Sequence, residues 1–355
     1  MGEKTITIVH GSPYEQGVQQ GQALVDLIAD NIKTLRENVE KCGCNMERYV
    51  LFMDKNAAFL QRECPDQIEE IKGIADGSGM KYEDILFINI PTYFMLQYFS
   101  QECSMILARG KATADGETYL IKNRDMRIPL QQVVIERHYD NGKIISEVNG
   151  AGIITYPGIG INSDGLALTT TGFWSKKAHI ELDEVEKRHI FVNIHLPLTR
   201  CRSVMEVIAH LENLPRMNGL NIIAVDKDDA ALIETTRNDM TVVHDDGSGI
   251  MFRTNHYLFE KNVCLNPDFS EYPSTFMRFK RINELLAQRL GKIRFQDLFR
   301  ILSDHENEPV NSICRHPNAL SVVETVSTTL VELEDKELWT TLDNPCLCLR
   351  RSCLF

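Results

Sequence analysis

The sequence has no long apolar run and no excess of basic residues. No stretch approaches the about 20 apolar residues of a membrane-spanning helix, and residues 1–9 are too few and too charged for a signal peptide. The 355 residues carry a formal net charge of -12 at pH 7, whereas nucleic acids and anionic membrane surfaces bind basic patches. We therefore expect a cytoplasmic protein with neither nucleic acid nor a membrane as its main partner. The sequence leaves open whether the protein forms an oligomer.

The sequence also lacks internal repeats, low-complexity linkers and the cysteine spacing that is typical of a zinc site. Ten cysteines are present, but a chain of this size in a reducing compartment needs no disulfides. Cys42 and Cys44, like Cys346 and Cys348, are separated by one residue. Zinc knuckles separate two ligands by about two to four residues and need a second pair nearby. We therefore expect no metal site and no cofactor.

The first third of the chain has the apolar period of helices, about 3.6 residues. After a short strand over residues 5–9, we predict helices over residues 13–41, 45–62, 65–79 and 84–99. Gly17 and Gly21 lie four residues apart on one face of the first helix. Because glycine has no side chain, another element could approach that face closely.

The rest of the chain is mainly β in pattern. From Met105 onward, short β-branched or alternating runs are separated by Gly, Asn and Asp, as in strands joined by turns. We predict strands over residues 105–108, 118–121, 133–138, 144–148, 152–155, 158–162, 166–171, 221–226, 230–235, 241–244 and 321–333, with helices from about 188 and over 203–214, 275–290 and 295–302. No linker divides the chain, so we expect one α+β body.

Cys103 lies where the helical pattern gives way to strands. A thiol at the first residue of a strand, with a β body behind it, is the arrangement of an N-terminal-nucleophile (Ntn) hydrolase. In such enzymes the chain is cut before the nucleophile, and the freed α-amine becomes its base. A tight turn at Asp115 and Gly116 returns the next strand beside Cys103, which brings Asn123 or Asp125 within reach. The alternative is an ordinary core thiol.

Further motifs follow Cys103 in a fixed order. They are the Asn123–Asp125 triplet, a Gly160, Asn162, Gly165 turn, Thr254–His256, Asp304 with His305, and Ser312–Arg315. Two further motifs precede Cys103, namely Gly11, Pro13, Glu15, Gly17 and Gly21, and then Lys72–Ala75. In this order the motifs resemble the acyl-CoA:isopenicillin N acyltransferase family of cysteine Ntn-hydrolases, over nearly the whole chain. The resemblance implies a four-layer αββα sandwich. It also implies self-cleavage between Glu102 and Cys103, which makes residues 1–102 a helical α subunit and residues 103–355 the β subunit.

The resemblance also implies roles for four residues. Cys103 matches the nucleophile, Asp125 the acid that positions the new α-amine, Asn255 an oxyanion-hole amide, and Arg315 a catalytic-site arginine. The α-amine, with a pKa of about 8, can take the proton of a thiol whose usual pKa is about 8.5. Three ordinary structural roles stay open: Asp125 in a turn, Asn255 at a strand end, and Arg315 in a surface ion pair.

The implied activity is acyl transfer or hydrolysis through an acyl-cysteine intermediate. The substrate is a small-molecule acyl amide or thioester, and acyl-CoA counts as a substrate rather than a cofactor. The cleaved N-terminal segment would be a partner of the remaining chain. Thr171 and Thr236 are expected to line the substrate pocket, although threonine is common in strands.

One residue departs from the family pattern, because Glu102 stands where the family usually has glycine. Glycine accepts a strained backbone, whereas glutamate restricts it and brings a like charge toward a thiolate. Two other functions therefore stay open. One is a choloylglycine-type hydrolase of N-acyl amides or bile salts, in which very few residues precede the cysteine. The other is an unprocessed binding protein without catalysis.

Overall fold

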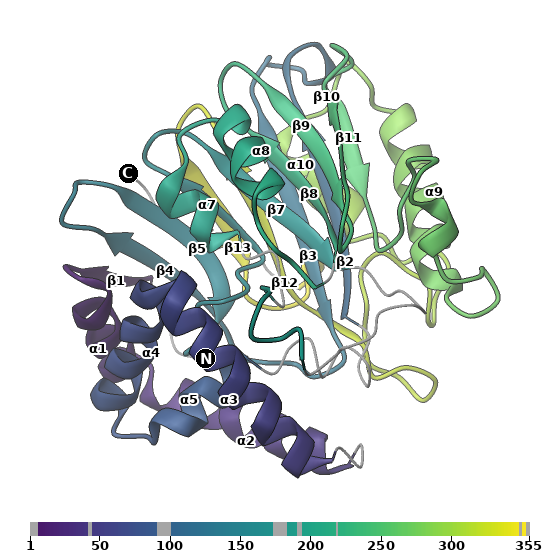
Figure 1. Cartoon of the computed structure of the whole chain (residues 1–355). Coiled ribbons are helices and arrows are strands. Elements are labelled where there is room, and N and C mark those ends of the chain that lie inside the picture. The colour runs from purple at the N-terminus through teal and green to yellow at the C-terminus, as the bar shows by residue number, and fades with distance from the viewer. Residues whose placement is uncertain are drawn as a thin grey trace.

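Two β-sheets lie face to face, and helices cover the outer face of each sheet (Figure 1). The structure is a computed structural model that describes residues 6–41, 45–90, 101–172, 183–189, 194–217, 219–347 and 350–352. Apolar side chains of both sheets fill the space between them, with Met105 and Leu107 of one sheet packed among Val134 and Ile159 of the other. The predicted αββα sandwich is confirmed.

The larger sheet has the strand order β1-β4-β5-β6-β7-β8-β9-β10. Its strands are β1 (Thr7–His10), β4 (Gln132–His138), β5 (Ile144–Gly150), β6 (Ile159–Asn162), β7 (Ala167–Gly172), β8 (Leu220–Val225), β9 (Ala230–Thr235) and β10 (Met240–His244). Helices α7 (His195–Arg200) and α8 (Val204–Glu212) cover its outer face. There Leu198 and Val207 pack with Ile145 and Leu168 of the sheet.

The smaller sheet has the order β11-β2-β3-β12-β13-β14. Its strands are β2 (Gln101–Ala108), β3 (Tyr119–Met126), β11 (Ile250–Arg253), β12 (Glu324–Glu332), β13 (Glu337–Thr341) and β14 (Arg350–Ser352). Helices α9 (Pro273–Ala287) and α10 (Phe295–Leu302) form the outer layer, where Ile282 and Leu298 pack with Ile106 and Ile121. Cys103 therefore lies on a strand of the smaller sheet, which α9 and α10 cover.

The N-terminal segment forms a helical layer at the lower left of Figure 1. Its helices are α1 (Pro13–Ala23), α2 (Val25–Lys41), α3 (Met46–Glu63), α4 (Pro65–Ser78) and α5 (Tyr82–Asn89). Ile28 and Ile71 of these helices share a hydrophobic core with Val133 and Ile135 of β4. The same segment adds β1 to the larger sheet by parallel pairing with β4. The helical segment is therefore packed onto the sandwich and also extends one of its sheets.

Helices α1 and α4 touch backbone to backbone. A Cβ atom added to Gly17 would lie 2.2 Å from the Glu70 carbonyl oxygen, and one added to Gly73 would lie 2.1 Å from that of Tyr14. Such distances leave no room for any side chain. The expectation of a close approach at the glycine face of the first helix is confirmed.

Several element boundaries differ from the sequence prediction. The predicted helix over 13–41 is two helices, because Leu24 leaves the helical region with φ -122° and ψ 21°. The predicted strand over 152–155 is a turn that contains Gly152 at φ 77°. The helix expected from about residue 188 begins at His195, and the strand expected from 321 begins at Glu324.

Two predictions concern residues outside the described ranges. The helix predicted over 84–99 ends at Asn89, and residues 91–100 are not among the described residues. The same is true of Cys42, Cys44 and Cys348.

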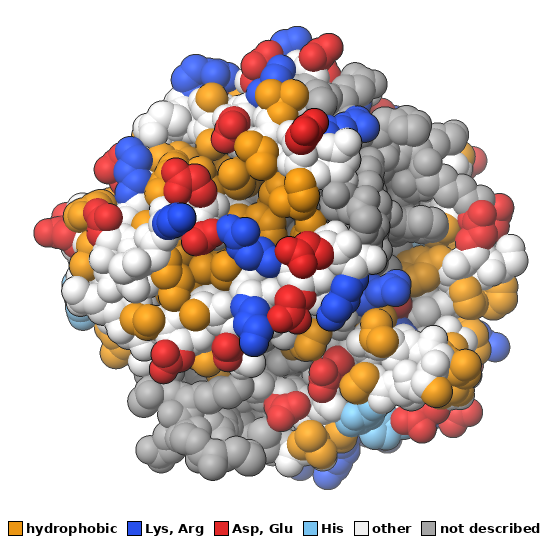
Figure 2. Space-filling model, turned by 90° about the horizontal axis from the view of Figure 1, so that it is seen from below, with side chains coloured by type: hydrophobic (Ala, Val, Ile, Leu, Met, Phe, Trp, Pro, Cys, Tyr) orange, Lys and Arg blue, Asp and Glu red, His pale blue; other side chains and the backbone are white. Residues whose placement is uncertain are grey.

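The described surface carries charge of both signs. On the face that Figure 2 shows, acidic and basic side chains are interspersed, and hydrophobic side chains lie between them. Among the described residues, no helix combines the length and the apolar character that crossing a bilayer requires.

The glycine contact predicts that Gly17→Ala destabilises the fold. Alanine is the better helix former by about 1 kcal/mol, so any loss must come from the forced separation of α1 and α4. Overpacking of this kind costs about 1–3 kcal/mol, which urea denaturation would measure. The control is Gly172→Ala, because a Cβ there meets no atom of the described residues within 4 Å. A Gly17→Ala protein as stable as wild type would contradict the contact.

Candidate active site

Cys103 is the third residue of β2, not the first residue of a strand as the sequence suggested. The strand begins earlier because Gln101 pairs with Met126 and Glu102 pairs with Asp125 on β3. Cys103 itself is buried, with 5% of its surface exposed. In this intact chain the bond before Cys103 is therefore part of a regular antiparallel ladder.

The side chains of β2 and β3 alternate between two faces of the sheet. Cys103 is paired with Arg124, and next to Arg124 on the same face lies Lys122. The Lys122 ammonium donates a hydrogen bond to the carbonyl of Gly158, at 3.1 Å, and also contacts Cys103. Burial lowers the pKa of Lys122, and the nearby Cys103 opposes that shift. The thiol thus lies on the side of the larger sheet, beside two cationic side chains.

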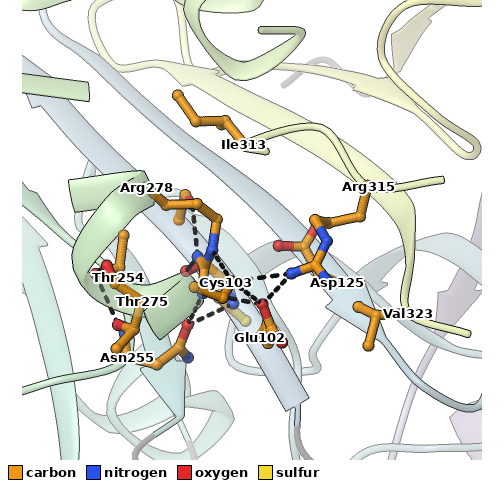
Figure 3. A network of polar contacts seen from close by, with 12 residues as sticks. Glu102, Cys103, Asp125, Thr254, Asn255, Thr275, Arg278, Ile313, Arg315 and Val323 are labelled. Carbon is orange, nitrogen blue, oxygen red and sulfur yellow. Dashed lines mark hydrogen bonds and ion pairs between the residues drawn. The ribbon is translucent and has the colours of Figure 1, made fainter. Parts of the chain in front are cut away.

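The Cys103 backbone is held at both its polar atoms. Its N–H donates to Asn255 Oδ1 at 2.9 Å, and its carbonyl oxygen accepts from Arg278 Nη1 at 2.6 Å. Arg278 Nη2 also donates to Asn255 Oδ1, at 2.9 Å. Figure 3 shows how Arg278 reaches down from α9 to join these groups. Three segments of the chain, which carry Cys103, Asn255 and Arg278, thus meet at the backbone of Cys103.

Glu102 points to the opposite face of the strand, where it lies between two guanidinium groups (Figure 3). Its Oε2 is 3.2 Å from Arg278 Nη2, forms an ion pair with Arg315 Nη1, and accepts a 2.7 Å hydrogen bond from Ser274 Oγ. Glu102, Arg278 and Arg315 are all buried. We call Glu102, Ser274, Arg278 and Arg315 the glutamate clamp. The expectation that Glu102 brings its charge toward the thiol is wrong, because the carboxylate is turned away and paired.

Asp125 lies inside β3, so its alternative assignment as a turn residue is wrong. Its Oδ1 accepts a 2.6 Å hydrogen bond from Thr325 Oγ1, which in turn accepts from the backbone N–H of Arg315 at 2.8 Å. Its Oδ2 is buried and has no hydrogen-bond partner among the described residues. Burial raises the pKa of Asp125 to about 6, although the charges of Arg278 and Arg315 oppose the shift.

Asn255 is fixed between α9 and the larger sheet. Its backbone N–H donates to Thr275 Oγ1 at 2.8 Å, and its side-chain Nδ2 donates to the carbonyl of Gly172 at 2.8 Å. Thr171 donates to the carbonyl of Thr254 at 2.5 Å, so its hydroxyl supports the segment that carries Asn255. These contacts fix the direction of the Asn255 amide.

The second threonine expected in the substrate pocket lies elsewhere in the fold. Thr236 follows β9, and its hydroxyl accepts from the Asp239 N–H at 3.0 Å across the turn into β10. This contact closes a hairpin, and it involves neither Cys103 nor the described residues that bind the Cys103 backbone. Substrate contacts of Thr171 and Thr236 stay predictions.

The structure brings together the four expected catalytic residues, two of them indirectly. Asn255 contacts the Cys103 backbone directly, whereas Arg315 is linked to it through Glu102, and Asp125 through Thr325 and Arg315. Arg315 has 2% of its surface exposed, so the alternative of a surface ion pair is wrong.

Sequence reasoning missed Arg278, although a signal was present. Ser274, Arg278 and Ile282 recur at four-residue spacing and all face inward on α9. A charged residue inside the apolar stripe of a helix must find a buried partner. Lys122 and Thr325 were missed as well, because a single polar residue within a strand pattern does not reveal which face it occupies.

A second buried ionic group lies away from Cys103. A cavity of about 360 Å³ is lined in part by Glu70, Tyr139 and His195. Behind it, the buried Arg137 pairs with Glu70 and, at 3.1 Å, with Glu147. This group links α4 to the larger sheet and has no residue in common with the glutamate clamp.

The fold and the site together define a class of protein. Two sheets between helical layers, with a buried cysteine near the start of a strand and an asparagine and arginines around it, are the arrangement of an Ntn-hydrolase. Residues 112–346 match the sequence model of the acyl-coenzyme A:6-aminopenicillanic acid acyl-transferase family, and the chain belongs to this family. The expected resemblance is confirmed. The protein is therefore an enzyme of the acyltransferase or amidohydrolase kind. The matched residues include Asp125, Asn255 and Arg315 and begin after Cys103.

Two solved structures are similar to the chain at low sequence identity. A variant of conjugated bile acid hydrolase from Clostridium perfringens is 16% identical with a TM-score of 0.45, and the alignment covers 67% of this chain and 88% of that chain. Penicillin V acylase from Agrobacterium tumefaciens is 14% identical with a TM-score of 0.44, over 67% and 82% of the two chains. No curated protein matches the chain.

The buried Asp125 predicts a pH-dependent stability of the intact chain. A folded-state pKa of about 6 against an ordinary value of 3.8 means that the folded state binds this proton more tightly. The stabilisation is full below pH 3.8 and is lost as the pH rises through about 6. It amounts to about 3 kcal/mol.

Cys103→Ala keeps the chain intact and serves as the background for this measurement. Urea denaturation between pH 3.8 and about 6 should show this loss of unfolding free energy in Cys103→Ala. The double variant Cys103→Ala/Asp125→Asn should lack it, because asparagine does not titrate. If the free energy of unfolding depended on pH in the same way in the two proteins, the raised pKa of Asp125 would be disproved.

Proposed function

We propose that Cys103 is the nucleophile of a self-processing acyltransferase or amidohydrolase, and that the chain is cut between Glu102 and Cys103. The observation that carries the proposal is the environment of Cys103. Its backbone is fixed by Asn255 and Arg278, and its thiol lies beside Lys122. A neighbouring cation favours a negatively charged sulfur, which is the reactive form of the group.

In the self-processing step, the Cys103 sulfur attacks the carbonyl carbon of Glu102. The peptide C–N bond breaks and the thiol proton passes to the Cys103 nitrogen, which leaves a thioester and a free α-amine. Water then cleaves the thioester, so that Glu102 gains an α-carboxylate and Cys103 regains its thiol. The freed amine can serve afterwards as the base for the thiol.

Asp125 supports this step through its unpartnered oxygen. Asp125 pairs with Glu102 across the two strands, so it lies close to the bond that would be cut. Its buried Oδ2 has no donor among the described residues, and an α-ammonium at Cys103 would supply one. An opposite charge at that position would also lower the pKa of Asp125.

The glutamate clamp makes Glu102 compatible with cleavage. Two guanidinium groups offset the Glu102 charge on the face away from the thiol, so no uncompensated anion opposes the attack. The extended backbone of Glu102 within β2 is one that any residue adopts. Glycine is therefore not required at this position.

In the proposed reaction with substrate, Cys103 takes the acyl group from a small-molecule amide or thioester, with acyl-CoA among the donors. The Asn255 amide stabilises the tetrahedral oxyanion when its Nδ2 exchanges the carbonyl of Gly172 for the substrate oxygen. A donor of this kind contributes about 3–4 kcal/mol. Water or an amine then resolves the acyl-cysteine, which makes hydrolysis and transfer two outcomes of one intermediate.

The N-terminal segment would stay bound after the cut as an α subunit. It shares a hydrophobic core with β4 and contributes β1 to the larger sheet. Neither contact involves the bond between Glu102 and Cys103. A single cut therefore leaves both contacts in place.

Self-processing predicts two fragments on a denaturing gel, of 102 and 253 residues (355 minus 102). Intact mass spectrometry should place the cut before Cys103. Cys103→Ala should give only the full-length chain, because the sulfur is missing, whereas Cys264→Ala, which changes an exposed cysteine, should be cut as in wild type. A wild-type chain that stays at full length after prolonged incubation would refute self-processing.

Acyl transfer predicts a covalent adduct on Cys103. Wild-type protein is incubated with a panel of N-acyl amino acids and acyl-CoA donors, and the acyl-enzyme is trapped by acid quench and located by peptide mass spectrometry. Cys103→Ala should lose turnover by roughly 10³-fold or more. Addition of an amine acceptor then separates transfer from hydrolysis by the product formed. Absence of an adduct with every donor would instead favour a binding protein.

A further inference from the structure

Four side chains of types that bind metal ions meet beside the backbone of Arg315. His305 follows α10, Cys314 and His316 flank Arg315, and Cys346 follows β13. One ligand atom from each of the four lies within 4.8 Å of the other three. Two thiols and two imidazoles from three separate segments thus converge on one point.

The distances between these atoms fit a tetrahedral ion. The two sulfur atoms are 3.9 Å apart, and His316 Nε2 lies 3.8 Å from the Cys314 sulfur and 3.3 Å from the Cys346 sulfur. Zinc bonds of about 2.3 Å to sulfur and about 2.0–2.1 Å to nitrogen place tetrahedral ligand atoms about 3.3–3.8 Å apart. A disulfide, by contrast, requires sulfur atoms about 2.0 Å apart.

We propose that His305, Cys314, His316 and Cys346 bind a structural zinc ion. Two thiolates with two imidazoles are a closed tetrahedral set, and this set selects zinc over magnesium or calcium, which prefer oxygen ligands. All four positions are taken by protein atoms. The ion would therefore have a structural role and no open position for substrate.

The surroundings of the four residues support this assignment. A carboxylate oxygen of Glu308 lies 3.8 Å from His305 Nδ1, and closing this contact to hydrogen-bond distance would give His305 the carboxylate partner that ligating histidines usually have. In that arrangement Nε2 is the metal-binding nitrogen. The Cys314 N–H donates to the carbonyl of Asp304 at 3.0 Å, which fixes the thiol against the end of α10.

Sequence spacing does not indicate this site, because the two cysteines of the cluster are far apart in the chain. The expectation of no metal rested on the spacing of Cys346 and Cys348, but the site uses Cys346 with a cysteine 32 residues earlier. Strands β12 and β13 form the antiparallel hairpin that returns the chain to this point. Only the folded chain brings the four side chains together.

The ion would stiffen the segment that carries Arg315. Its ligands Cys314 and His316 are the two neighbours of Arg315 in sequence, and Asn344, two residues before Cys346, donates to the Arg315 carbonyl at 3.2 Å. The metal would thus join the C-terminal segment to the Arg315 backbone. Through Arg315 it would hold the glutamate clamp in place.

The test is metal analysis of the untagged full-length protein after dialysis against metal-free buffer. Inductively coupled plasma mass spectrometry should find one zinc per chain in wild type and in Cys264→Ser, which changes an exposed cysteine outside the cluster. Cys314→Ser, His316→Ala and Cys346→Ser should each lose most of the zinc. Cys346 is exposed, so Cys346→Ser should keep its fold by circular dichroism and remain an interpretable variant.

Cobalt substitution gives an independent readout that does not depend on enzyme activity. Co²⁺ bound at this site should show tetrahedral d–d bands and a thiolate-to-metal charge-transfer band, and the latter should weaken in Cys346→Ser. The proposal is overturned if wild type holds no zinc, if the folded Cys346→Ser protein keeps as much zinc as wild type, or if peptide mapping finds a Cys314–Cys346 disulfide.

Discussion

The buried carboxylate of Glu102 is the group around which the candidate site is assembled. An isolated charge in a protein interior is costly, so it must be matched by opposite charge and hydrogen bonds from nearby. Here the matching groups come from α9, through Ser274 and Arg278, and from the segment before β12, through Arg315. Pairing this one charge therefore fixes the positions of two segments, α9 and the segment before β12, relative to the strand that carries Cys103.

The same pairing explains why the Cys103 backbone is so tightly held. Arg278 contacts Glu102 on one side and the Cys103 carbonyl and Asn255 on the other. One guanidinium group thus couples the ionic contact directly to the Cys103 carbonyl and, through Asn255, to the Cys103 N–H of the peptide bond at which cleavage is proposed. Removal of Glu102 or Arg278 would leave its partner charge buried, so the two residues depend on each other.

The sequence predicted the class of fold and the cysteine, because these follow from local patterns. The change from helical to strand periodicity pointed to Cys103, and the motif order pointed to Asn255 and Arg315, which the structure brings near it. The extension of β2 to Gln101 was missed, because it depends on β3 continuing to Met126, beyond residue 121 at which the predicted strand ended. Arg278 was missed because an arginine in a helix usually points to solvent. Its partner Cys103 lies 175 residues away in sequence, so only tertiary structure reveals this contact.

The parallel pairing of β1 with β4 has one more consequence. A parallel pair needs a long crossover, and in this chain the crossover contains helices α1 to α5 as well as β2 and β3. Cys103 lies within that connection. A chain cut there would hold β1 against β4 through noncovalent contacts alone, and unfolding would release two separate polypeptides. The resistance of such an enzyme to denaturation would then depend on its concentration, as it does for a heterodimer.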